Sequence, residues 1–204
     1  MREILKSELQ KGDILLCKPK KSDWLSMTVK EIDGGAYSHA ALYIEDGKVI
    51  QSEFKCIAHN ELEKDVMDPH SGIDVYRYVK DGYLLGSLNL PSEPVIKHSF
   101  ELKDEGHKYA KSHMLLLAVL YELRKEHLSK IEKEILAPIL EASLLFLEKV
   151  IDHGKDPLVC SEVVYRCFND IKDNSGNSTY PIEFKDIIFD LEGKKKYNKY
   201  YKFF

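Results

Sequence analysis

The spacing of apolar residues in this 204-residue chain changes once, near residue 100, and that change limits the folds available to it. Before it, short apolar runs are separated by turn residues, and several alternate with polar residues, which is typical of β-strands. After it, apolar residues recur at helical spacing from about Leu102 to Ile151. Strands followed by helices in this order indicate an α+β fold.

The strand-rich part lies between residues 12 and 80. The turn at Gly12-Asp13 precedes a first apolar run, and the Asp46-Gly47 step between two later runs is a strong signal for a β-hairpin. The expected strands cover residues 14–17, 39–44, 48–54 and 73–78. A short helix is expected within residues 23–33.

The second half of the chain is expected to be mostly helical. Residues 81–100 contain Pro91 and Pro94 and are expected to form a loop. We interpret residues 102–152 as a helical insertion within a single domain that covers residues 1–204. A last helix is expected from about Cys160 to about Ile171.

Composition narrows the classes of protein to consider. The net charge of −4 argues against nucleic-acid binding, which usually shows a basic balance. The four cysteines form no CxxC pair, so neither a disulfide framework nor a zinc site is indicated, and no metal or cofactor is expected. The N-terminal residues lack the apolar stretch of a secretory signal, and no apolar run is long enough to span a bilayer. A cytoplasmic protein is the default expectation, with export by a non-classical route as the alternative.

Cys160 is the residue whose sequence context most favours chemical reactivity. Asp156 is a good N-cap and Pro157 suits the first helical position, so Cys160 is predicted in the first turn of a helix. The positive end of a helix dipole favours thiolate over thiol. Cys160 also shares a helix face with Val164 and Cys167, which directs the thiol toward the protein. The other three cysteines, Cys17, Cys56 and Cys167, are expected in the core.

His39 begins an expected strand and is the candidate base for that thiol. A cysteine and a histidine together can form a thiolate–imidazolium pair, in which the histidine accepts and later returns a proton. Gln51 and Glu53 alternate along the next strand, and either side chain could orient the imidazole ring. Backbone amides at the start of the cysteine helix, those of Cys160 and Ser161, could bind an oxyanion.

Three segments together resemble a known family. They are Gly12-Asp13-Ile14-Leu15, the run from Ser38-His39-Ala40 to Val49-Ile50-Gln51, and Cys160-Ser161-Glu162-Val163-Val164. In this order the chain resembles the circularly permuted NlpC-type papain-like proteins of the YiiX-like branch, in which the histidine strand precedes the cysteine helix. The matched segments lie within residues 12–54 and 156–171.

The resemblance implies a permuted papain-like fold, in which a small antiparallel sheet packs on the cysteine helix. It also implies Cys160 as nucleophile and His39 as base. The family's third polar position lies twelve residues beyond the histidine and falls on Gln51, where glutamate or histidine is common. Glutamine would orient the ring without supplying a charge, and Glu53 is the alternative.

The expected activity is cleavage of an amide through a Cys160 acyl-thioester, in a peptide, a cell-wall-type peptide or an isopeptide. Two alternatives stay open. Permuted relatives that resemble the lecithin retinol acyltransferase group move lipid acyl groups, and the apolar helices of residues 102–152 would suit such a substrate. The same fold could also be a non-catalytic binding module in which Cys160 is an unreactive core thiol. The lysine- and aromatic-rich tail, residues 194–204, is expected to be a final strand or a solvated end, with membrane contact less favoured.

Overall fold

The computed structural model describes residues 4–22, 27, 36–52, 56–106, 160–182 and 197–203, the last range as backbone. The helices and strands in chain order are η1 (Lys6–Glu8), β1 (Ile14–Pro19), β2 (His39–Glu45), β3 (Lys48–Ser52), β4 (Ile57–Glu61), η2 (Leu62–Met67), β5 (His70–Lys80), β6 (Tyr83–Leu84), α2 (Glu93–Asp104), α5 (Cys160–Asn169) and β7 (Tyr197–Phe203).

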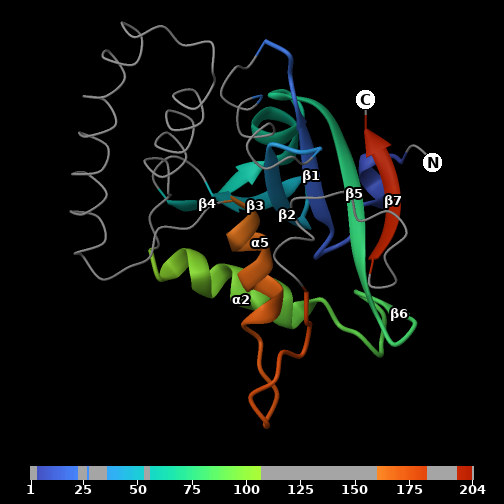
Figure 1. Cartoon of the computed structure of the whole chain (residues 1–204), viewed down its shortest axis with the longest axis vertical. Helices are drawn as coiled ribbons and strands as arrows, with labels where there is room; N and C mark the ends of the chain where they lie inside the picture. Colours follow the sequence, from blue (N-terminus) through green and yellow to red (C-terminus); the bar gives the residue numbers. More distant parts are fainter. Residues whose placement is uncertain are drawn as a thin grey trace, which may run out of the picture.

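An antiparallel sheet with the strand order β4-β3-β2-β1-β5-β6 forms the centre of the described structure, and β7 also pairs with β5 (Figure 1). The predicted α+β class is therefore confirmed. The hairpin between β2 and β3 turns at Asp46-Gly47, where φ is 49° and 72°. Positive φ at both central residues is what a tight two-residue hairpin turn requires, so the Asp-Gly prediction is confirmed.

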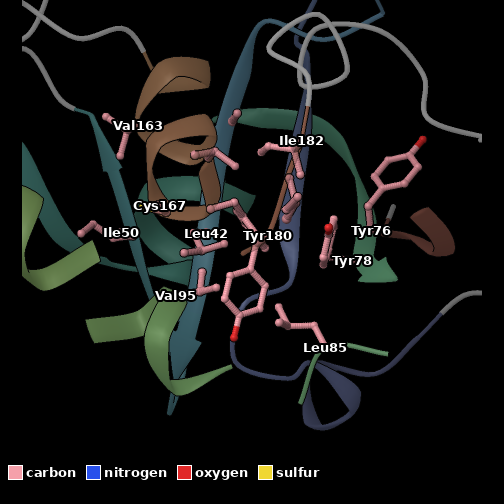
Figure 2. Packing of buried hydrophobic residues seen from close by; sticks show 14 of the residues in the cluster. Leu42, Ile50, Tyr76, Tyr78, Leu85, Val95, Val163, Cys167, Tyr180 and Ile182 are labelled. Atoms are coloured by element: carbon pink, nitrogen blue, oxygen red, sulfur yellow. The ribbon is translucent and has the colours of Figure 1, made fainter. Parts of the chain in front are cut away.

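The central strands bury side chains on both faces of the sheet, and each face contacts a different set of elements. Ile14 and Leu16 of β1 belong to one apolar cluster together with residues of α2 and α5. Leu15 and Cys17 alternate with them and belong to a second cluster with residues of η2. Helices α2 and α5 lie next to each other on the first of these faces (Figures 1 and 2).

Helix α5 packs on β2 and β3 through the stripe that its sequence predicts. Val163, Val164, Cys167 and Phe168 are all 0% exposed and lie in the same cluster as Leu42 of β2. Figure 2 shows Val163 and Cys167 on the same side of the sheet as Leu42. Burying four side chains at helical spacing fixes both the rotation of the helix and its place on the sheet.

Two predictions of local structure are wrong. Residues 81–100 are not all loop, because α2 begins at Glu93; Pro94 lies in its first turn, where a missing N–H costs nothing. Cys56 is exposed rather than buried. It immediately precedes β4, and Ile57 takes the buried position there.

Several expected features lie outside the described residues. These are most of the helix expected within residues 23–33, the stretch 107–152 of the expected insertion, the N-cap Asp156, and Glu53. Two strands are longer than expected, since β1 extends to Pro19 and β5 covers His70–Lys80. Residues 57–61 form a strand, β4, that the sequence patterns did not indicate.

A buried ion pair joins the turn before β1 to β5. Nε of Arg77 donates to Oδ1 of Asp13 at 2.7 Å, and Nη2 donates to Oδ2 at 2.8 Å. The backbone N–H of Gln10 donates to the same carboxylate at 2.8 Å. Both charged side chains are almost fully buried, at 8% and 0% exposed. The two-point contact fixes where β1 starts relative to β5.

Loss of one partner of this pair should be costly. We expect Asp13→Ala to lower the free energy of unfolding by about 3–5 kcal/mol, because Arg77 would stay buried without its carboxylate. The double variant Asp13→Leu with Arg77→Met removes both charges and should recover most of that loss. Urea unfolding followed by circular dichroism measures both effects. An Asp13→Ala protein as stable as the wild type would contradict the assignment.

Candidate functional site

His39 is the first residue of β2, and it pairs across the sheet with Cys17 of β1. The chain just before it is irregular. Tyr37 and Ala40 both belong to the α5-side cluster although they are three residues apart, so the regular alternation of a strand begins only after His39. His39 therefore lies at the end of the sheet, where the chain passes from one face to the other.

The imidazole of His39 is held by Gln51 of β3. The distance between Nε2 of His39 and Oε1 of Gln51 is 2.7 Å. An amide oxygen can only accept a hydrogen bond, so Nε2–H of His39 is the donor. A neutral His39 in this arrangement carries its lone pair on Nδ1. Gln51 is 3% exposed, and exclusion of water strengthens a hydrogen bond of this kind.

Gln51 comes from the second face of the sheet. Val49, two residues earlier on β3, packs in the cluster with Cys17 and Leu62. By alternation the Gln51 side chain points to that same side, opposite α5. The His39 ring therefore meets Gln51 on the η2 side of the sheet. Tyr37, two residues before His39, packs on the α5 side.

Cys160 is the first described residue of α5 and is partly exposed. At the other end of the helix, the ring of Phe168 lies 5.6 Å from that of Tyr78. Burial is the main reason why the pKa of the Cys17 thiol is raised well above its ordinary value, and Cys160 and Asp74 raise it further. Cys160 therefore lies near enough to Cys17, the β1 residue that pairs with His39, to affect its pKa. Helix α5 itself packs on the face of the sheet opposite the one to which Gln51 points.

The structure describes only some of the other residues predicted for the site. Ser161 follows Cys160 in α5 and is partly exposed, so both residues whose amides are the expected oxyanion donors belong to this helix. Glu53, the alternative orienting residue, lies outside the described residues. Of the two candidates, Gln51 is the one whose side chain the structure describes, and it contacts His39.

A buried polar cluster, which the sequence patterns did not reveal, anchors the chain before His39. The hydroxyl of Tyr37 donates to Oδ2 of Asp74 at 2.8 Å, and Nζ of Lys18 donates to the same oxygen at 2.8 Å. The hydroxyls of Tyr37 and Tyr76 are 3.1 Å apart. Burial is the main reason why the pKa of Tyr37 is raised, so its hydroxyl stays a donor. The signal in the sequence is Asp74, a carboxylate within an apolar strand.

A second histidine, His70, lies next to His39 and was not predicted as a site residue from the sequence. The ring of His70 stacks on that of His39, with 5.4 Å between centroids and 10° between planes. The strand expected from the sequence begins only at Ile73, three residues after His70, so no sequence pattern indicated this histidine.

The chain matches no protein-family model, and no curated protein matches it either. Among the described residues there is no group of three or more potential metal ligands. The described helices are also too short or too polar to cross a membrane.

The four cysteines should differ sharply in reactivity. We expect iodoacetamide to modify Cys56 and Cys160 in the folded protein and to spare Cys17 and Cys167, which are 0% exposed and whose pKa values are raised by burial. Burial protects these two thiols in two ways, because it blocks access of the reagent and disfavours the thiolate, which is the reactive form. Peptide mass spectrometry with and without urea measures the pattern. Modification of Cys17 or Cys167 in the folded state as fast as that of Cys56 would show that the described packing is wrong.

Proposed function

We propose that the chain is a thiol hydrolase with a permuted papain-like fold, in which Cys160 is the nucleophile and His39 the base. The observation that carries this proposal is the hydrogen bond from Nε2–H of His39 to the buried Oε1 of Gln51. It selects the tautomer in which Nδ1 can take a proton from a thiol. Two observations support it: α5 packs on β2 and β3, and Cys160 raises the pKa of Cys17, the β1 residue that pairs with His39.

The first half-reaction forms an acyl-thioester. The proton of the Cys160 thiol passes to Nδ1 of His39, and the thiolate attacks the carbonyl carbon of an amide. The carbonyl oxygen gains the negative charge, which the backbone amides of Cys160 and Ser161 would stabilise. His39 then donates its Nδ1 proton to the nitrogen, the C–N bond breaks and an amine leaves.

The second half-reaction restores the enzyme. A water molecule gives a proton to Nδ1 of His39 and adds to the thioester carbonyl. The C–S bond breaks, a carboxylic acid leaves, and the proton on His39 returns to Cys160. Both steps require Sγ of Cys160 within hydrogen-bond reach of Nδ1 of His39, about 3 Å, in the working state.

An amide is the substrate class that this arrangement suits best. The amine that leaves an amide must be protonated, and a histidine whose tautomer and orientation are fixed supplies that proton at the reacting nitrogen. Peptides, cell-wall-type peptides and isopeptides all contain such a bond. Which of them is cleaved would depend on the surroundings of Cys160, to which residues 107–159 are directly joined.

The nucleophile assignment can be tested by the pH dependence of Cys160 alkylation. In a Cys56→Ser background, we expect Cys160 to react with iodoacetamide rapidly well below pH 8, because the His39 imidazolium would stabilise its thiolate. His39→Ala should remove this reactivity at neutral pH and restore the behaviour of an ordinary thiol.

The rate is read by mass spectrometry at a series of pH values, with Cys160→Ala as the blank. The same two variants should lose amide cleavage on a panel of peptide and isopeptide substrates. A parallel panel of lipid esters tests the alternative, acyl transfer. A wild-type Cys160 that reacts like a model thiol, with or without His39, would rule out the thiolate–imidazolium pair.

Gln51 should affect the reactivity of Cys160 by orienting the His39 ring. We expect Gln51→Leu to slow neutral-pH alkylation of Cys160 about three- to tenfold, the cost of one buried hydrogen bond. Gln51→Glu would place a carboxylate beside the imidazolium and favour its charged form. The pKa of His39 should then rise, which titration of the ring by NMR in wild type and Gln51→Glu would measure.

Val49→Ala is the matched control, because Val49 is a buried β3 residue on the same face of the sheet as Gln51. It should lower stability but leave the alkylation profile unchanged. If Gln51→Leu and Val49→Ala have the same effect on alkylation, the contact between Gln51 and His39 has no role in the chemistry.

A further inference from the structure

His70 lies beside the proposed base without having a part in the mechanism above. It is the first residue of β5 and is partly exposed. It pairs with Pro19 just beyond a register shift in β1, so the pleat is irregular there. Its ring is nearly parallel to that of His39, with 5.4 Å between the ring centroids and an interplanar angle of 10°. This distance is within the range of offset-stacked aromatic pairs.

The ring of His70 is itself fixed from the core. The distance between its Nδ1 and the carbonyl oxygen of Val66 is 2.7 Å. Since a carbonyl can only accept, Nδ1–H of His70 is the donor. Val66 is 0% exposed and lies in the last turn of η2, where carbonyls lack partners within the helix. A histidine side chain is a usual partner for such carbonyls.

The contacts made by His70 and Gln51 constrain the His39 ring in different directions. The stack covers a face of the ring, whereas both ring nitrogens point outward in the ring plane. Gln51 binds Nε2 in that plane at 2.7 Å. Neither contact alone fixes both the tilt and the rotation of an imidazole, but the two together do.

We propose that His70 is a positioning residue for His39. Its ring, held by Val66, keeps the His39 ring in the plane where Nε2–H meets Gln51 and Nδ1 is directed to the proton exchange with Cys160. The catalytic importance of this contact rests on the function proposed above. The stack itself, and its effect on the His39 tautomer, do not.

The competing explanation is that His70 serves only as a helix cap. The two roles use different parts of one side chain, since the cap uses Nδ1–H and the stack uses the ring face. His70→Gln keeps an N–H donor for the Val66 carbonyl but has no ring. His70→Phe keeps a flat ring but has no donor. The pair of variants therefore separates the two roles.

The decisive measurement is the tautomer of His39 by long-range ¹H–¹⁵N NMR of the imidazole, assigned by comparison with His39→Ala. We expect the neutral ring to be almost wholly the Nε2–H form in the wild type and in His70→Phe. In His70→Gln the population of the Nδ1–H form should rise about fivefold, as expected for loss of one ring contact. An unchanged spectrum in His70→Gln, or the same change in both variants, would overturn the proposal.

The alkylation rate of Cys160 at pH 7, measured in the Cys56→Ser background, distinguishes failure of this proposal from failure of the proposed function. His70→Gln should slow alkylation about fivefold, while His70→Phe should retain the wild-type rate even if its unfolding temperature falls. If Cys160 reacts no faster than Cys56 does in the wild-type chain, the proposed function fails. The His39 spectra would still decide the role of His70.

Discussion

The described structure depends on where β1 begins, and the buried contact between Asp13 and Arg77 sets that point. β1 lies between β2 and β5, so its register determines which residues meet at the sheet end. The Asp13 carboxylate binds Arg77 of β5, and the backbone of Asp13 accepts the N–H of Tyr43 on β2. Cys17 is consequently placed opposite His39. A slip of one residue would turn every one of these side chains to the other face.

The Gly12-Asp13 step thus has a structural reason apart from any family resemblance. Gly12 has a φ of 87°, which other residues rarely adopt, and a Cβ there would lie 2.4 Å from Cδ2 of Leu85. The turn must be tight so that Asp13 can enter the buried position that it occupies, at 0% exposed. The proposed site at the far end of β1 relies on this turn for its alignment.

The candidate site is best understood as a histidine constrained from several sides. Tyr37, two residues before His39, is anchored to the buried Asp74, and Gln51 and His70 contact the His39 ring itself. Gln51 comes from β3, and Asp74 and His70 come from β5, so these contacts hold only when the sheet is folded. Such preorganisation is what a proton-transfer group needs, because a small error in ring orientation costs much of the rate.

Local patterns in the sequence were enough to predict the α+β class, the Asp46-Gly47 hairpin and the buried face of α5. Each depends on residues close together in the chain, where alternation, helical period and turn chemistry act directly. The start of α2 was missed because Pro94 and its neighbours resemble a loop as much as a first helical turn. Cys56 was misplaced because an apolar residue at a strand boundary can point either way.

The contacts around His39 show where sequence patterns stop being informative. Alternation along the second strand left Gln51 and Glu53 open, the family resemblance favoured Gln51, and the hairpin brings Gln51 and His39 together. His70 and Asp74 approach the site through the pairing of β5 with β1, across a long separation in sequence. No local period signals such a contact. The resemblance to permuted papain-like proteins added an expectation for Cys160, which the proposal carries forward.

The most direct test of the account is a chemical cross-link between the two proposed catalytic atoms. 1,3-Dibromoacetone can alkylate a thiolate first and a nearby imidazole second, so it bridges only groups that lie within a few bonds of each other. Applied to the folded Cys56→Ser protein at neutral pH, it should yield a peptide that joins Cys160 to His39 through Nδ1. A product in which Cys160 is alkylated without reaching His39, in a protein that remains folded, would contradict the central claim.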